Sequence, residues 1–205
     1  MKALMTVRTF FLWFFCMAVA LWSLRFLLAG VEASMEFVAY HAIERRLAFF
    51  AHVGLAPVAL MLVPLQFWAR LRTDRPALHR WLGRVYAVTI LLAGVGGLLM
   101  AIGTQAGPVA ALGFGLLAVA WVGSTVLAVW HIRNKRVALH KAWMIRSAAL
   151  TLAAVTLRLE MPILVMTVGL ETGYPLVAWL CWMPNLLIAE WMVRRRPVMG
   201  AAQPA

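Results

Sequence analysis

Six long apolar runs constrain the fold of this chain more than any other feature. About 20 residues of helix cross the hydrocarbon core of a bilayer, and runs of that length recur along the whole sequence. A water-soluble domain of 205 residues could not bury so much apolar surface, since 64% of the residues are hydrophobic and only 13% are charged. We therefore expect an all-α bundle of six transmembrane helices over residues 9–29, 47–68, 85–105, 109–132, 142–169 and 175–193.

The basic residues predict how this bundle is oriented. In a soluble protein a net charge of +12 would suggest nucleic-acid binding, but here the charges lie in short segments between apolar runs. Fourteen Lys and Arg and one acid fall in segments 1–8, 69–84, 133–141 and 194–205, whereas two Arg and four Glu fall in segments 30–46 and 170–174. Short basic segments stay in the cytoplasm. The pattern predicts a multi-pass protein of a cell inner membrane with both termini cytoplasmic and no nucleic-acid partner.

The two ends of the chain need separate treatment. We expect one transmembrane domain over residues 1–196 and a flexible cytoplasmic tail over 197–205. Val31-Glu32-Ala33 is similar to a signal-peptidase site, but the preceding apolar run is longer than a typical signal sequence and contains Arg25. We expect the first helix to be retained; cleavage would leave five spans. Segment 31–46 has apolar residues spaced for a short helix on the outer surface.

A basic, histidine-bearing segment occurs twice. Arg75-Pro-Ala-Leu-His79-Arg80 returns as Arg136-Val-Ala-Leu-His140-Lys141, at a constant offset of 61 residues. The repetition predicts that the second and third helices form a hairpin equivalent to the fourth and fifth, related by an axis along the membrane normal. His79 and His140 would then lie at the same depth on either side of the axis.

Two motifs in the same region connect the chain to a known family. They read Arg75-Pro-x-x-His79-Arg80-x-x-Gly83-Arg84-x-Tyr86 and His140-x-x-Trp143-Met144-x-Arg146-Ser147, and they are preceded by Pro64-Leu-Gln66-Phe and followed by Arg158. The chain resembles the bacterial predicted membrane proteins grouped as number twenty-three-zero-six among the domains of unknown function. The resemblance covers the second to fifth helices. It implies a multi-pass membrane protein and brings no activity.

Three histidines at the cytoplasmic ends of helices are the first candidates for a cofactor site. Imidazole is the usual axial ligand of b-type haem, and helix bundles hold such haems between their helices. We expect His79 and His140 to face one another with His131 nearby, where they would bind one b-type haem or a quinone. The alternative is that they cap helices at the interface, beside the Arg and Trp that are ordinary there.

His52 is a fourth candidate, near the outer end of the second helix. A polar residue at that depth faces protein rather than lipid. Gln66, 14 residues later, lies almost on the same helix face. Cytochromes of the b561 type use two histidines at about such a spacing, but here the second position is Gln66. His41 is expected in the surface segment, so the pattern predicts one haem at most.

The fifth helix carries the strongest intramembrane signal. Ser147, Thr151, Ala154, Arg158 and Pro162 form one stripe. An arginine inside a membrane costs at least about 2.5 kcal/mol on insertion scales unless it is paired or meets water. One interpretation is an anion or proton site of a small-solute or proton-coupled transporter.

That site would be formed by His52, Arg158 and Glu160. The alternative is a buried network with Arg25 that fixes the packing of the helices.

The remaining polar residues favour structural roles. Arg146 and Glu190 are expected to pair across the fifth and sixth helices, and glycines at 94–97, 113–115 and 123 would let the third and fourth approach closely. No Ser/His/Asp triad, HExxH or cysteine motif is present, so no catalytic residue is predicted. The leading hypothesis is a redox-related membrane protein that binds a b-type haem or quinone and meets a redox partner. The others are the transporter and a non-catalytic subunit of an oligomer.

Overall fold

The computed structural model describes residues 2–30 and 35–195. Every regular element in this part of the chain is a helix. Six helical stretches are long and apolar enough to cross a membrane, which confirms the six-span prediction; they are Thr9–Leu28, Arg46–Phe67, Pro76–Ile102, Gly107–Arg133, Val137–Val168 and Leu170–Arg194. The signal-peptidase-like site and the predicted tail lie outside the described residues. The orientation in the membrane and the internal repeat stay predictions.

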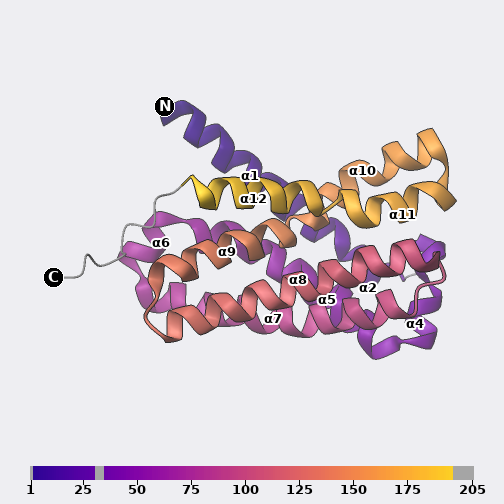
Figure 1. Cartoon of the computed structure of the whole chain (residues 1–205), viewed down its shortest axis with the longest axis horizontal. Coiled ribbons are helices and arrows are strands. Elements are labelled where there is room, and N and C mark those ends of the chain that lie inside the picture. Colours follow the sequence, from indigo (N-terminus) through magenta and orange to yellow (C-terminus); the bar gives the residue numbers. More distant parts are fainter. Residues whose placement is uncertain (1, 31–34, 196–205) are drawn as a thin grey trace.

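The helices run between two ends of an elongated bundle (Figure 1). One end holds α6, the start of α1 and the end of α12, and we call it the terminal end; the other holds α4 and the turn between α10 and α11, and we call it the α4 end. The elements are α1 Lys2–Ser23, α2 Arg25–Leu28, η1 Glu36–Val38, α4 Tyr40–Glu44, α5 Arg46–Phe67, α6 Ala69–Asp74, α7 Pro76–Ile102, α8 Gly107–Arg133, α9 Val137–Thr151, α10 Ala153–Val168, α11 Leu170–Leu180 and α12 Met183–Arg194.

Residues 69–84, which the predicted spans leave as a basic segment between the second and third helices, are themselves mostly helical. They form α6 and the first turns of α7, which begins at Pro76. Proline is favoured there because the first residues of a helix need no N–H donor and the fixed φ suits the helix. His79 is therefore the fourth residue of α7, and His140 is likewise the fourth residue of α9. Both histidines lie in first helical turns at the terminal end.

Glycines bring α5 and α7 into close contact. A Cβ at Gly96 would collide with the Ala48 carbonyl of α5, and one at Gly97 would press on the His52 ring. The sequence predicts that these glycines join the third and fourth spans, but they face the second. Gly94 does face α8, where its missing Cβ leaves room for Val122. Small residues allow backbones to approach, and their partner depends on which face each residue occupies.

The fifth and sixth spans are broken near their midpoints. Leu152 separates α9 from α10, where the Thr151 hydroxyl donates to the Ser147 carbonyl at 2.8 Å, a bond that often bends helices. The sixth span breaks between Leu180 and Met183, just before Pro184, which has no N–H to continue the ladder. After these breaks α10 packs on α11, and α12 packs on α9. The divergence occurs at the α4 end, where the cavity described next lies.

Candidate binding site at the α4 end

A cavity of about 530 Å³ lies between the helices in the half of the bundle next to α4. Its walls come from α1, α2, η1, α4, α5, α7, α8, α9, α10 and α11 and the residues beside them. Aromatic and thioether side chains form part of the apolar wall, among them Trp22, Phe26, Phe49, Met100, Phe114 and Trp121. A smaller cavity of about 70 Å³ shares His52 and Arg158 with it. The larger volume lies within the range of small-molecule sites.

The His52 ring has a fixed orientation on the cavity wall. Its Nδ1 lies 2.8 Å from the carbonyl oxygen of Ala93 on α7, so Nδ1 carries the proton and donates it. The close approach of the ring to α7 depends on Gly97. Nε2 is left with its lone pair, and it has no hydrogen-bond partner among the described residues. His52 can therefore accept a hydrogen bond from a molecule in the cavity.

Arg158 places a positive charge on the same cavity. Its Nη1 donates to the Ala154 carbonyl at 2.9 Å, and its Nη2 donates to the Ser23 hydroxyl at 2.6 Å. Ser23 in turn donates to the Val19 carbonyl at 2.7 Å, so the end of α1 is tied to α10. In the described part of the chain no carboxylate lies within 4.0 Å of Arg158. The guanidinium is held by neutral oxygens and keeps its charge available to an anion or a carbonyl.

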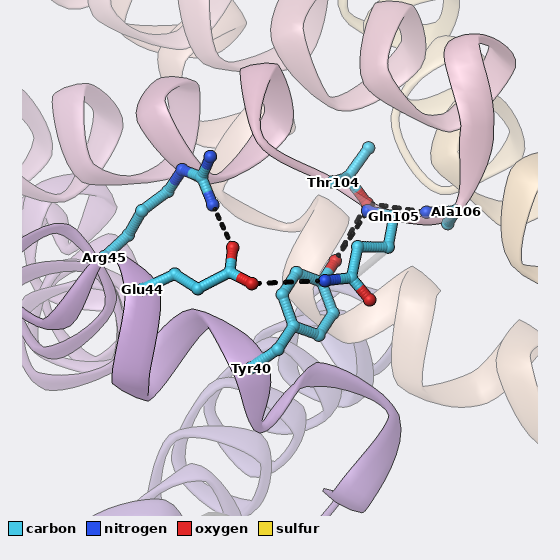
Figure 2. Close-up of polar contacts among 6 residues, drawn as sticks. All are labelled: Tyr40, Glu44, Arg45, Thr104, Gln105 and Ala106. Atoms are coloured by element: carbon cyan, nitrogen blue, oxygen red, sulfur yellow. Dashed lines mark hydrogen bonds and ion pairs between the residues drawn. The ribbon is translucent and has the colours of Figure 1, made fainter.

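A short helix covers the cavity at the α4 end. Figure 2 shows α4 tied to the turn between α7 and α8: the Gln105 backbone N–H donates to the Tyr40 hydroxyl at 2.9 Å, and that hydroxyl lies 3.3 Å from Thr104 Oγ1. The Gln105 amide also donates to Glu44 at 3.3 Å, and Arg45 bonds the other carboxylate oxygen at 2.8 Å. These contacts hold α4 as a cap.

His41 lies on the inner side of this cap. The sequence predicts it in a surface segment, but only 2% of it is exposed, and it lines the cavity together with His52. Burial lowers the pKa of His41, and the charge of Arg45 lowers it further, while Glu44 acts in the opposite direction. Its buried Nδ1 has no hydrogen-bond partner within the described ranges. The short helix forms as predicted, but its histidine faces inwards.

Glu160 is not among the residues that line the cavity, although the transporter hypothesis groups it with His52 and Arg158. Its Oε2 is buried without a hydrogen-bond partner in the residues the structure describes. Arg146, in contrast, forms the expected pair with Glu190 of α12, with Nη2 donating to Oε2 at 3.0 Å. Its guanidinium also lies over the Trp143 ring, 4.5 Å from the centroid. This pair joins α9 to α12 away from the cavity.

The other three candidate histidines lie together at the terminal end. His140 Nδ1 donates to the Ala128 carbonyl at 2.9 Å, which leaves Nε2 as its acceptor. His140 interacts electrostatically with His79 and with His131, so it lies in the vicinity of both. The Nδ1 atoms of His79 and His131 are buried and have no partner among the described residues. Neither cavity is lined by any of the three.

A buried network of hydroxyls lies between the two ends; the stripe of the fifth helix includes its Ser147 and Thr151, but their partners on other helices were not predicted. The Tyr86 hydroxyl is 3.0 Å from Ser147 Oγ and 2.9 Å from Thr151 Oγ1. Thr125 contacts Ser147 at 2.7 Å, and the Trp121 indole donates to Thr151 at 2.8 Å. A signal was present, since Tyr86 and Ser147 are 61 residues apart, as are His79 and His140.

In the part of the chain that the structure describes, six apolar helical spans around a ligand-sized cavity define a multi-pass helical membrane protein. A family model described as "Predicted membrane protein (DUF2306)" matches residues 49–193. That match covers more than half of the chain, so the chain belongs to this family, in agreement with the resemblance of its motifs. No curated protein and no solved structure matches. Within the described ranges, no group of three or more His, Cys, Asp or Glu is arranged to hold a metal ion.

Proposed function

We propose that this protein binds a lipid-soluble quinone in the cavity at the α4 end and takes part in redox chemistry of the membrane. One observation supports the proposal above all others. The acceptor nitrogen of His52 and the guanidinium of Arg158, which donates to neutral oxygens, share one cavity with aromatic side chains in its wall. These are the groups that a quinone head requires, because its carbonyl oxygens accept hydrogen bonds and its reduced hydroxyls donate them.

The walls favour a flat, lipid-soluble ligand over a hydrated solute. Ring faces such as Phe49, Phe114 and Trp121 stack on conjugated rings, and Met100 adapts to their edges. A transported ion or sugar would need several polar groups to replace its hydration shell. We therefore place quinone binding ahead of solute transport.

Tryptophan fluorescence offers a direct test, since Trp22 and Trp121 both line the cavity. A benzoquinone with a ten-carbon tail should quench the emission of the intact protein in lipid nanodiscs in a saturable manner. Arg158→Leu should weaken this binding by roughly tenfold or more, the effect of losing a charged hydrogen bond of about 1.5–3 kcal/mol.

Arg194→Leu is the matched control, because Arg194 is exposed at the far end of α12 and should leave binding unchanged. Membrane levels and helical circular dichroism of both variants check that they fold. If Arg158→Leu and His52→Leu bind the quinone as tightly as the parent protein, the proposal is wrong.

A second candidate function, b-type haem binding, is favoured by a separate observation. His41 and His52 line the same cavity, and His52 donates Nδ1–H to a backbone carbonyl, the orientation typical of a ligating imidazole. Arg25 and Arg158, which also line the cavity, would suit the haem propionates. A reduced-minus-oxidised spectrum of protein expressed with sufficient haem would then show sharp b-type bands that His52→Ala removes. A flat spectrum of the parent protein would exclude this function.

A further inference from the structure

A series of buried and half-buried polar side chains leads from the terminal end of the bundle to the cavity. It begins at the half-buried His79 and His140 in the first turns of α7 and α9 and at the buried His131 in the last turn of α8. A membrane-spanning helix does not need buried polar side chains to be stable. Each polar group that lacks a hydrogen-bond partner in hydrocarbon costs several kcal/mol, by order of magnitude. Their presence inside the bundle requires a physical reason.

Gln66 continues the series one helical turn further in. Only 7% of Gln66 is exposed, and its Oε1 lies next to Gly83, where an added Cβ would be 3.3 Å away. Gly83 lies four residues after His79 and three before Tyr86, so the three positions form one stripe of α7. The Nε2 of Gln66 is buried without a hydrogen-bond partner in the described part of the chain. Gln66 thus lies between the histidines and the hydroxyl network.

The hydroxyl network completes the series. Tyr86 contacts Ser147 and Thr151, and Thr151 and Trp121 both line the large cavity. Hydroxyl groups donate and accept at once, so a chain of them can pass a proton by exchanging donors and acceptors. In the described part of the chain, the buried nitrogens of His79, His131 and Gln66 have no protein partner, so water is needed to satisfy them and to join these side chains to the hydroxyl network.

We propose that a column of polar side chains, with water between them, is a proton path between the terminal end and the cavity. The column consists of His79, His131, His140, Gln66, Tyr86, Ser147, Thr125 and Thr151. Each proton that enters at the histidines displaces another towards Thr151, with no bond other than O–H and N–H made or broken. The path would supply or remove the protons of a molecule in the cavity, and that last role rests on the proposed function. Proton conduction itself does not depend on it.

The test uses the full-length protein in lipid vesicles that enclose a pH-sensitive dye, with a potassium gradient and valinomycin to drive protons inwards. We expect the parent protein to raise proton entry above that of protein-free vesicles. Tyr86→Phe combined with Ser147→Ala should return it to the protein-free level. Thr89→Val is the matched control, because the buried Thr89 hydroxyl donates to the Val85 and Tyr86 carbonyls of its own helix and, among the described residues, bonds no hydroxyl of the column.

Gln66→Leu gives a second variant in case the double variant does not fold. It removes an unpartnered amide, so it should leave folding intact while it stops proton entry. Proton entry no faster than in protein-free vesicles, or a folded Gln66→Leu protein that conducts like the parent, would overturn the proposal. Quenching by the ten-carbon-tailed benzoquinone is measured on the same samples: conduction without quinone binding refutes the proposed function alone, and quinone binding without conduction refutes the proton path alone.

Discussion

The two ends of the bundle hold histidines that are anchored in the same way but stand in different surroundings. His52 donates Nδ1–H to the Ala93 carbonyl at the α4 end, and His140 donates Nδ1–H to the Ala128 carbonyl at the terminal end. His52 borders a cavity of about 530 Å³, whereas neither of the two cavities includes His140. The difference lies in the backbone, because the fifth and sixth spans break and diverge only towards the α4 end. The same anchored histidine is therefore a candidate binding residue only where a cavity lies beside it.

The largest expected loss of stability comes from the close contact between α5 and α7, beside His52. Gly96→Ala should destabilise the fold by about 1–3 kcal/mol, because the new Cβ collides with the Ala48 backbone carbonyl, which cannot rotate away. Gly54→Ala is the matched control: no atom lies within 4 Å of its added Cβ, and alanine favours helix. Denaturation in detergent micelles followed by circular dichroism measures both. Equal stability of the two variants would contradict the close α5–α7 packing.

The next largest loss of stability should come from a substitution away from the cavity. Glu190→Gln should destabilise the contact between α9 and α12 by about 1–2 kcal/mol, since the partly buried Arg146 loses its counter-charge but keeps some solvent. Arg194→Gln, which weakens only the longer contact to Glu190 at 3.9 Å, should change stability by less than about 0.5 kcal/mol. Quinone quenching should be unchanged in both. A loss of quinone binding in Glu190→Gln would show that the two ends are coupled.

A smaller effect is expected from the cap itself. Tyr40→Phe removes the hydroxyl that joins α4 to Thr104 and Gln105, at a cost of about 1 kcal/mol. Backbone amides of residues 36–44 should then exchange with deuterium faster, while the core of α7 should keep its protection. Mass spectrometry of peptides from the two regions measures both. Unchanged exchange in the cap would mean that the bonds drawn in Figure 2 do not hold it.

The smallest expected effect is a pH dependence of how firmly the α4 cap docks on the bundle. Burial lowers the pKa of His41 from its ordinary 6.5, so the undocked cap binds a proton more readily than the docked one. Docking is therefore at full strength above pH 6.5 and weakens as the pH falls below it towards the lowered pKa. Deuterium exchange of residues 36–44 should speed up on acidification. His41→Phe should remove that dependence; its persistence would assign it to another group.

The sequence predicted the framework of this protein because the framework depends on local properties. Run length predicts six spans, and the described residues contain six. The pairing of Arg146 with Glu190 followed from their depths alone. The charge of residues 69–84 separates the second span from the third but does not show that the segment is helical; Arg75-Pro76 begins α7 there, because charged side chains on a helix can still reach water.

What only the tertiary structure decided is which polar residues meet. His41, Ser23 and Trp121 became site residues through contacts between segments far apart in the chain, and Glu160, which the sequence grouped with Arg158, does not line the cavity. Periodicity reports the face of a helix on which a residue lies, but not the neighbour that this face meets. Which helix lies next to a given face depends on glycine contacts and helix breaks. The apolar runs of the sequence therefore determined a six-span membrane protein. The packing of the helices determined where the cavity lies.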